Sequence, residues 1–281
     1  PESKKTMMTM ILSGVSMFFL SSVIFLLLEV FDPRTKTPTS FTKQVKLNLA
    51  GILNEIPIKK TTEQEILTTD YMGKKFTRQI FYKNNTRKLR YQLLNSPNKI
   101  FLITSTQKKA GKTTVIESLA ASLLLSKKKV MIIDLNFGNN TITQKHNPQV
   151  LIEDIGEFSK YDMPLKNQQL LQNTLSIDGL HIIGCREGNF TPSEALHKIN
   201  LERFLKLLKD EFDFILIEGA ALNDFADSRE LNAYSEEVFT VFSATSSVTQ
   251  EDIKSIQFIN SLGVKNRGAI LNNVQLENIN F

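Results

Sequence analysis

The strongest constraint on the fold is an apolar run that leads through a lysine-rich loop into a helical pattern. Residues 99–104 (KIFLIT) predict a short buried strand, and residues 112–125 have the apolar spacing of a helix. The stretch TQKKAGKTT, from Thr106 to Thr114, joins the two. A glycine and a lysine at such a turn wrap backbone N–H groups around phosphate. This order of elements predicts a phosphate-binding loop (P-loop) in an α/β domain.

The residue types in this loop suit a nucleotide bound with its magnesium ion. Gly111 permits the close turn, Lys112 brings a positive charge to the β- and γ-phosphates, and the Thr113 hydroxyl can ligate Mg²⁺. The start of the following helix adds the positive end of its dipole. The alternative is a chance loop in an α/β domain. We predict ATP and Mg²⁺ as cofactors, with the nucleotide bound by Thr106, Lys109, Ala110, Gly111, Lys112, Thr113 and Thr114.

Further apolar runs alternate with helical patterns along the rest of the chain. Continuous apolar strands separated by helices predict a mainly parallel, doubly wound sheet of the P-loop NTPase type, covered on both faces. Ligands of such sheets bind at the carboxyl ends of the strands. The expected strands are 129–134, 179–184, 213–218, 237–242 and 267–271, and the expected helices are 192–211 and 248–262.

Two of the expected strands end on an acid. Asp134 ends the run 129–134, and Glu218 ends the run 213–218. Each carboxylate could reach Mg²⁺ beside the P-loop, directly or through water. The alternative is that each acid only caps its strand. We predict Thr113, Asp134 and Glu218 as metal ligands, and Lys112, Asp134 and Glu218 as catalytic residues.

An uncharged segment near the start of the chain predicts a membrane helix. Thr6 to Leu28 is a run of 23 residues without a charge, and about 20 apolar residues cross a bilayer. Its length and the lack of a small-residue cleavage site argue against a signal peptide. Positive residues stay on the cytoplasmic side, and Arg34, Lys36 and Lys43 follow the segment. We therefore expect the remainder of the chain to be cytoplasmic.

These patterns divide the chain into three expected parts. Residues 1–30 are a transmembrane helix with a short periplasmic flank, residues 31–72 a juxtamembrane linker, and residues 73–281 the cytoplasmic nucleotide-binding domain. Because the chain begins with Pro1 rather than Met, we expect a fragment or a processed form.

The charge of the chain is concentrated in one stretch. Lys74 to Lys112 holds eleven Lys and Arg and no acid, a composition that attracts phosphate, anionic lipid or an acidic protein face. A solvated basic face is the alternative. Nucleic acid is not expected as a partner, since no recognition-helix, zinc-finger or RNP pattern is present. A single cysteine excludes a disulfide scaffold and a thiolate zinc cage.

Together these features resemble the bacterial tyrosine kinases of polysaccharide co-polymerases. The match covers nearly the whole chain and includes the membrane helix, the P-loop and the strand at 129–134. Further motifs that carry it are Asp32-Pro33-Arg34, Asn54-Glu55-Ile56-Pro57, Arg87-Lys88-Leu89-Arg90, the segment from Asn189 to Leu196, and Leu271-Asn272-Asn273.

The resemblance implies a biological setting. The segment 87–90 resembles the tail of an oligomerisation helix, so a homo-oligomer is implied. Asn272 stands where a strand-end Asn contacts adenine in related P-loop ATPases, which adds it to the nucleotide-binding residues. A protein of the bacterial inner membrane is implied, which acts with a polymerase and export machinery in the chain length or export of a surface polysaccharide. A periplasmic domain and a first membrane helix would precede Pro1.

The chain departs from the family pattern in ways that weaken kinase chemistry. The family carries D-x-D where this chain has Asp134-Leu135-Asn136, and Asp where it has Glu218. Asn136 cannot act as a base or bring a second negative charge to the metal. Asn84 replaces a Glu of the oligomerisation motif, and residues 277–281 hold no tyrosine cluster.

Three functions therefore remain open. In the first, the domain transfers the γ-phosphoryl group of ATP to tyrosines on a partner or to water. In the second, it is a scaffold that binds ATP and scarcely turns it over. In the third, it is an ATPase similar to ParA and MinD, although Gln107 stands where those proteins carry a signature lysine.

Overall fold

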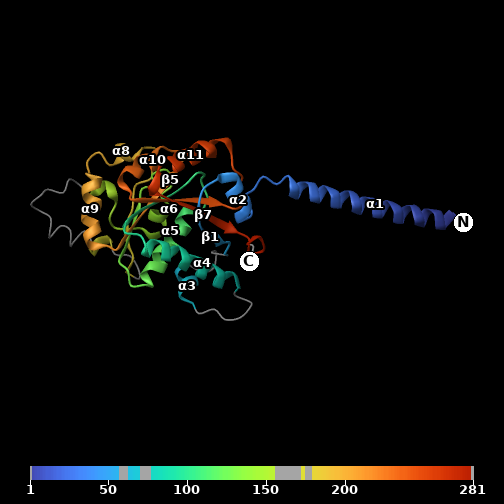
Figure 1. Cartoon of the computed structure of the whole chain (residues 1–281), viewed down its shortest axis with the longest axis horizontal. Coiled ribbons are helices and arrows are strands. Elements are labelled where there is room, and N and C mark those ends of the chain that lie inside the picture. The colour runs from blue at the N-terminus through green and yellow to red at the C-terminus, as the bar shows by residue number, and fades with distance from the viewer. Residues whose placement is uncertain (1, 57–62, 70–76, 156–171, 175–178, 280–281) are drawn as a thin grey trace, which may run out of the picture. The chain divides into compact units, whose positions relative to one another are not determined.

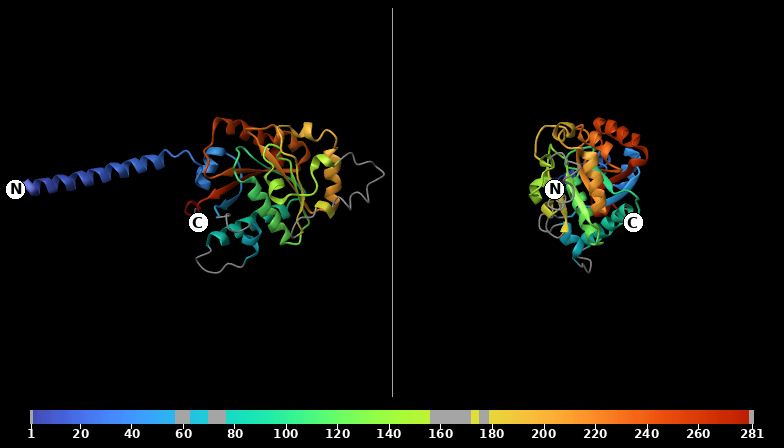
Figure 2. Two further views of the ribbon diagram at one scale, coloured as in Figure 1. Left: turned by 180° about the vertical axis from the view of Figure 1, so that it is seen from behind. Right: turned by 90° about the vertical axis from the view of Figure 1, so that its left-hand side faces the viewer.

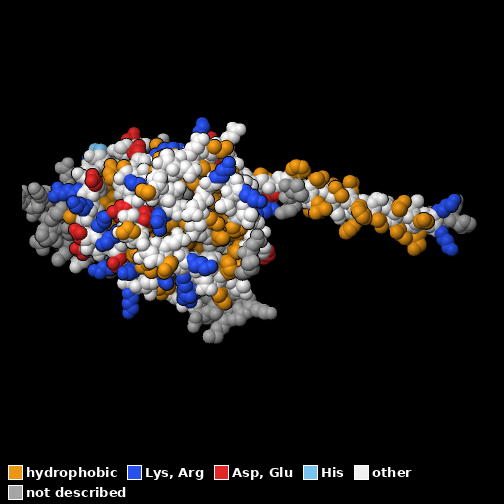
Figure 3. Space-filling view, viewed as in Figure 1, with side chains coloured by type: hydrophobic (Ala, Val, Ile, Leu, Met, Phe, Trp, Pro, Cys, Tyr) orange, Lys and Arg blue, Asp and Glu red, His pale blue; other side chains and the backbone are white. Residues whose placement is uncertain are grey.

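The computed structural model describes residues 2–56, 63–69, 77–155, 172–174 and 179–279. It divides the chain into two compact units, Pro1–Arg34 and Thr35–Phe281. The first unit contains α1 (Glu2–Val30), a single uninterrupted helix (Figure 1). Hydrophobic side chains cover α1 along its length (Figure 3). Within the described residues it is the one helix long and apolar enough to cross a membrane.

The second unit is built on a seven-stranded sheet. Its order is β1-β7-β6-β2-β5-β3-β4, and every pairing in it is parallel. The expectation of a mainly parallel α/β sheet is therefore confirmed. The strands are β1 (Leu49–Asn54), β2 (Ile100–Ser105), β3 (Val130–Asp134), β4 (His181–Ile183), β5 (Phe214–Ala221), β6 (Glu237–Ser243) and β7 (Asn266–Val274).

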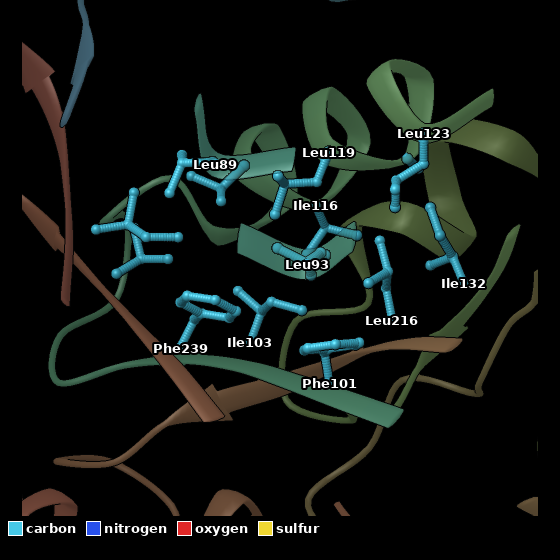
Figure 4. Packing of buried hydrophobic residues seen from close by; sticks show 14 of the residues in the cluster. Leu89, Leu93, Phe101, Ile103, Ile116, Leu119, Leu123, Ile132, Leu216 and Phe239 are labelled. Atoms are coloured by element: carbon cyan, nitrogen blue, oxygen red, sulfur yellow. The ribbon is translucent and has the colours of Figure 1, made fainter. Parts of the chain in front are cut away.

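Helices lie on both sides of this sheet (Figure 2). Alternate residues of a strand point to opposite faces, and the buried residues of β2 separate accordingly. Phe101 and Ile103 pack with α4 and α5 (Figure 4), whereas Ile100 and Leu102 pack with α9. The helices are α2 (Pro38–Val45), α3 (Glu63–Thr68), α4 (Thr77–Leu94), α5 (Lys112–Leu124), α6 (Thr141–His146), α8 (Pro192–Ala195), α9 (Leu201–Glu211), α10 (Asp227–Leu231) and α11 (Gln250–Ser261).

The helix expected over residues 192–211 is interrupted in the structure. The side chain of Asn200 accepts a hydrogen bond from the backbone N of Arg203 at 3.0 Å, which starts α9 as a new helix. A side-chain cap of this kind satisfies a backbone N–H that a continuous helix would already have paired. The segment expected to be one helix therefore contains two, α8 and α9, with separate N-terminal caps.

The boundary expected between residues 72 and 73 is not where the structure divides the chain. The expected linker 31–72 contributes α2, β1 and α3 to the second unit. The strand β1 was missed because LAGILN is short and holds weak strand formers. Its formation depends on tertiary contacts: Leu53 is fully buried, and a Cβ on Gly51 would lie 2.5 Å from Leu89 Cδ2 of α4.

The burial of β1 is testable by truncating one side chain. In residues 35–281, Leu53→Ala should lower the free energy of unfolding by about 2–5 kcal/mol, because it leaves a cavity in the core. Ile52→Ala, in the same strand but only partly buried, should cost less. Urea unfolding measures both. A loss no larger for Leu53 than for Ile52 would mean that this segment is a linker after all.

Candidate functional site

The P-loop between β2 and α5 turns through two residues of left-handed backbone. Lys109 has φ 60° and Gly111 has φ 92°. The glycine is required at its position, since a Cβ there would overlap Nδ2 of Asn272. The same Nδ2 donates a hydrogen bond to the carbonyl of Ala110 at 3.1 Å. Asn272, near the end of β7, thus supports the backbone of the loop.

A cavity of about 480 Å³ lies against this loop. It is bounded by the P-loop, by the segment after β3 and by the carboxyl-terminal part of β5, as the topology of a parallel sheet predicts. Its lining residues are Lys108, Lys109, Gly111, Lys112, Thr113, Thr114, Asn136, Gly138, Asn139, Thr141, Glu218, Ala221 and Phe225.

Most of the residues predicted for the site meet at this cavity, but four do not line it. Thr106, Ala110, Asp134 and Asn272 are each at most 3% exposed and stand behind its surface. A contact of Asn272 with a nucleotide base therefore stays a prediction. Its observed role is to hold the loop backbone.

Lys112 lies at the base of the loop with its ammonium group buried. Its Nζ donates to Oγ of Ser105 at 3.2 Å, and the residue is 7% exposed. Burial lowers the pKa of Lys112, whereas the carboxylates of Glu218 and Asp224 act to raise it. Because water solvates this cation so poorly, an anion bound beside it would stabilise the charged form.

Glu218 is the acid that lines the cavity. Its Oε1 and Oε2 lie 3.0 and 3.2 Å from Oγ1 of Thr113, which donates to the carboxylate. Burial, followed by the nearby charge of Asp134, raises the pKa of Glu218 to about 8; Lys112 and hydrogen bonds from Thr113 and Asn136 oppose that rise. Since β5 continues to Ala221, this acid lies within the strand rather than at its end.

Asp134 accepts its hydrogen bonds from the part of the chain that follows β3. The register of β3 against β5 places it opposite Glu218. Its Oδ1 accepts from the backbone N of Asn136 at 3.1 Å, and its Oδ2 accepts from the backbone N and Oγ1 of Thr143 at 3.0 and 2.7 Å. Burial raises the pKa of Asp134 against these hydrogen bonds, which lower it. The carboxylate holds the first turn of α6, and its predicted role as a metal ligand is untested.

Several residues that line the cavity were not predicted for the site, among them Lys108, Gly138 and Phe225. Lys108 Nζ lies 4.9 Å from the ring centroid of Phe225 and 3.5 Å from Oδ1 of Asp224. The ring of Phe225 packs on Gly138, where a Cβ would lie 2.6 Å from it. These contacts join the P-loop to the segments after β3 and β5. Nothing in the local sequence around Phe225 indicates them, because they arise from the sheet order.

Comparison with proteins of known sequence finds bacterial tyrosine kinases. "Tyrosine-protein kinase etk" of Escherichia coli K12 is 23% identical over 192 residues, and "Tyrosine-protein kinase ptk" of Acinetobacter johnsonii is 22% identical over 190. A "putative tyrosine-protein kinase in cps region" of Klebsiella pneumoniae is 25% identical over 187 residues. Each alignment covers 66% of this chain but only 25% of the relative. No family model matches the chain.

The chain is similar to the bacterial tyrosine kinases. Solved structures show the same fold: the kinase domain of Escherichia coli tyrosine kinase ETK superposes with a TM-score of 0.64 at 18% identity, covering 87% of this chain and 95% of that one. The BceF tyrosine kinase domain gives 0.65 at 19% identity, covering 86% of this chain and 99% of that one. The expected resemblance to bacterial tyrosine kinases is therefore confirmed, and the domain has the bacterial tyrosine kinase fold.

The raised pKa of Glu218 predicts a pH-dependent stability. The native state holds this proton at pH values where the unfolded chain has released it, so stability falls as pH rises from about 4.5 to about 8. In residues 35–281 without Mg²⁺, Glu218→Gln should therefore gain roughly 4 kcal/mol relative to the unmodified domain between pH 5 and pH 8.5.

Urea unfolding at the two pH values measures this gain. The control is Glu236→Gln, because burial alone would raise the pKa of Glu236 but its hydrogen bonds from Lys209, Lys99 and Ile100 lower it. Because the lowered pKa keeps Glu236 ionised in the native state at both pH values, that change should destabilise the domain about equally at pH 5 and pH 8.5. A Glu218→Gln effect that is equal at both pH values would show that Glu218 is ionised throughout.

Proposed function

We propose that this chain is a membrane-anchored ATP-binding component of surface-polysaccharide biosynthesis, with a kinase-like P-loop domain whose phosphoryl transfer is weak. The observation that carries the proposal is the cavity in which Lys112, Thr113 and Glu218 meet at the P-loop. The polysaccharide setting rests on similarity to tyrosine kinases that include one from a cps region. The chain spans a quarter of these relatives, so the activity and partners of a whole relative are part of the proposal.

The residues that line the cavity fit a nucleotide triphosphate. Lys108, Lys109 and Lys112 bring three positive charges to it, and burial lowers the pKa of Lys112 more than the nearby carboxylates raise it. The left-handed turns at Lys109 and Gly111 are of the kind that direct backbone N–H groups toward an anion. Lys112 would bind the phosphates, and the start of α5 would add its dipole.

The oxygen atoms beside the P-loop fit Mg²⁺ carried by the nucleotide. Thr113 Oγ1 and the Glu218 carboxylate are neighbours at 3.0 Å, and both are hard oxygen donors. Within the described residues no group of three His, Cys, Asp or Glu could hold a metal ion. This pattern suits Mg²⁺, which keeps waters and phosphate oxygens as its other ligands. Bound Mg²⁺ would supply charge stabilisation, and Glu218 would lose its proton to bind it.

The small number of carboxylates at the cavity is the reason why we propose slow turnover of ATP. Glu218 is the one carboxylate among the residues lining the cavity, and Asn136 stands beside it as a hydrogen-bond donor. Asp134 is occupied by Thr143. Phosphoryl transfer needs charge stabilisation and an oriented acceptor, and a single carboxylate must serve both. Binding of ATP that sets an assembly state is therefore the favoured function, and phosphorylation of a partner's tyrosines is the alternative.

The proposed location is supported by α1. Its apolar length and the Arg and Lys that follow it support anchoring in a bacterial inner membrane, with the P-loop unit in the cytoplasm. We also propose a homo-oligomer that works with the polymerase and export machinery of the polysaccharide. Residues 74–76 of the basic stretch lie outside the described residues; on the face seen in Figure 3, Lys and Arg are spread among acids rather than gathered in one patch.

Removing the P-loop lysine should weaken nucleotide binding. Lys112→Ala deletes a charge-assisted contact to phosphate worth about 1.5–3 kcal/mol, so the affinity for ATP should fall roughly tenfold or more. Isothermal titration with MgATP measures it. The control Lys128→Ala removes the same charge from a residue that does not line the cavity, and should bind normally. Unchanged affinity in Lys112→Ala would place the nucleotide elsewhere.

Restoring the missing acid should raise turnover. Asn136→Asp adds a second carboxylate beside Glu218 that can help to hold Mg²⁺ or orient the acceptor, and Glu218→Asp combined with it should act non-additively, because the two share one site. The assay is ATP hydrolysis and phosphotyrosine formation on a tyrosine-rich peptide. Asn139→Asp places a charge in the same cavity without the contact to Glu218 and should stay slow. Brisk phosphorylation by the unmodified chain would contradict the account.

A further inference from the structure

A buried carboxylate on α11 holds the beginning of the P-loop. Asp252 is 1% exposed, and its Oδ2 accepts hydrogen bonds from the backbone N and Oγ1 of Thr249 at 2.7 and 2.8 Å. The bond from the Thr249 backbone belongs to the capping box of α11, whose other half is the bond from the backbone N of Asp252 to Oγ1 of Thr249 at 3.3 Å. The same oxygen also accepts from Nε2 of Gln107 at 2.6 Å. That bond is not needed to cap the helix, and it joins α11 to the P-loop.

The other oxygen of Asp252 holds a second loop. Oδ1 accepts from Nδ2 of Asn223 at 2.9 Å, in the segment that follows β5. The Oδ1 of Asn223 accepts from Ser255 on the next turn of α11 at 2.6 Å, and its backbone N donates to the carbonyl of Thr106 at 3.0 Å. One carboxylate is therefore the common acceptor for the P-loop, the β5–α10 segment and the N-terminus of α11.

The side chain of Gln107 is directed into this network and does not line the cavity. Its Nε2 donates to the carbonyl of Ser247 at 2.9 Å as well as to Asp252. The backbone carbonyl of Gln107 accepts a hydrogen bond from Oγ of Ser105 at 2.6 Å. The Ser105 hydroxyl in turn accepts a hydrogen bond from Nζ of Lys112 at 3.2 Å. A connected path of backbone and hydrogen bonds thus runs from the cap of α11 to the phosphate-binding lysine.

The network suits an ionised acceptor. Burial by itself would raise the pKa of Asp252, but hydrogen bonds from Thr106, Thr249 and Gln107 outweigh it and leave the pKa below its usual range. Hydrogen bonds to a charged group are roughly twice as strong as those between neutral groups. The contact from Gln107 is therefore a strong restraint on the loop.

We propose that Gln107 and Asp252 form an anchor that positions the P-loop for phosphate binding, so that nucleotide affinity depends on the cap of α11. Gln107 acts as a positioning residue: it orients Ser105 and Lys112 through its backbone and touches no phosphate itself. The inference rests on the proposed nucleotide-binding function. It assigns a structural purpose to a glutamine where ParA-like ATPases carry their signature lysine.

The test uses the full 281-residue chain in detergent and MgATP as the probe. Gln107→Met keeps the length of the side chain and removes its donor. Asp252→Asn removes the charge of the acceptor, and the double variant closes a cycle. Ile259→Val is the control: Ile259 is fully buried on the same helix, lies outside the network, and loses about 0.5–1.5 kcal/mol of stability on this change. Calorimetric affinity and the thermal midpoint are measured for each.

Gln107→Met should bind MgATP about fivefold more weakly, while Ile259→Val, at a comparable loss of thermal stability, keeps the affinity of the unmodified chain. The double variant should have almost the same MgATP affinity as whichever single variant binds MgATP more weakly, because both changes break the same anchor. Unchanged affinity in Gln107→Met, or an equal loss in Ile259→Val, overturns the anchor and leaves the proposed function standing. An unmodified chain that binds no MgATP overturns the proposed function and the anchor together.

Discussion

The parallel pairing of β3 with β5 is the constraint on which the site depends. It sets Asp134 directly opposite Glu218, and both carboxylates are almost completely buried. Two such groups cannot both remain ionised without positive partners. The two carboxylates have different surroundings. Asp134 accepts three hydrogen bonds from the loop and helix that follow it. Glu218 lies beside Thr113 and Lys112. One acid organises the loop, and the other remains available at the cavity.

The P-loop is held at two points, Gln107 and Ala110, by elements that do not line the cavity. Asn272 from β7 holds the carbonyl of Ala110, and Asp252 from α11 holds the amide of Gln107. The residues between these two supports line the cavity, including Lys108 and Lys109. A loop that is already fixed before a ligand arrives loses less conformational entropy on binding, so this arrangement favours affinity over adaptability.

Sequence patterns predicted the elements that a short stretch of sequence is enough to identify. Six strands follow from apolar runs, and the P-loop follows from its glycine and lysine between a strand and a helix. The strand β1 could not be predicted, because its residues become strand only through pairing with β7 and packing under Leu89. Likewise, the contact of Gln107 with Asp252 joins segments 145 residues apart, which the order of strands in the sheet brings together. Asn272 was expected at the site from resemblance, but its bond to the loop carbonyl came only from the structure.

The position of β1 has a consequence for how the domain is made. Leu49 pairs with Ala269, so a strand near the beginning of the unit finds its partner only in β7, the last of the described strands along the chain. The sheet order places β7 between β1 and β6, so β1 cannot join the sheet before β7 is present. Pairing of segments this distant in sequence is slow and leaves strand edges open in the meantime. During synthesis β1 therefore emerges well before its partner, and its pairing edge stays open until β7 has left the ribosome.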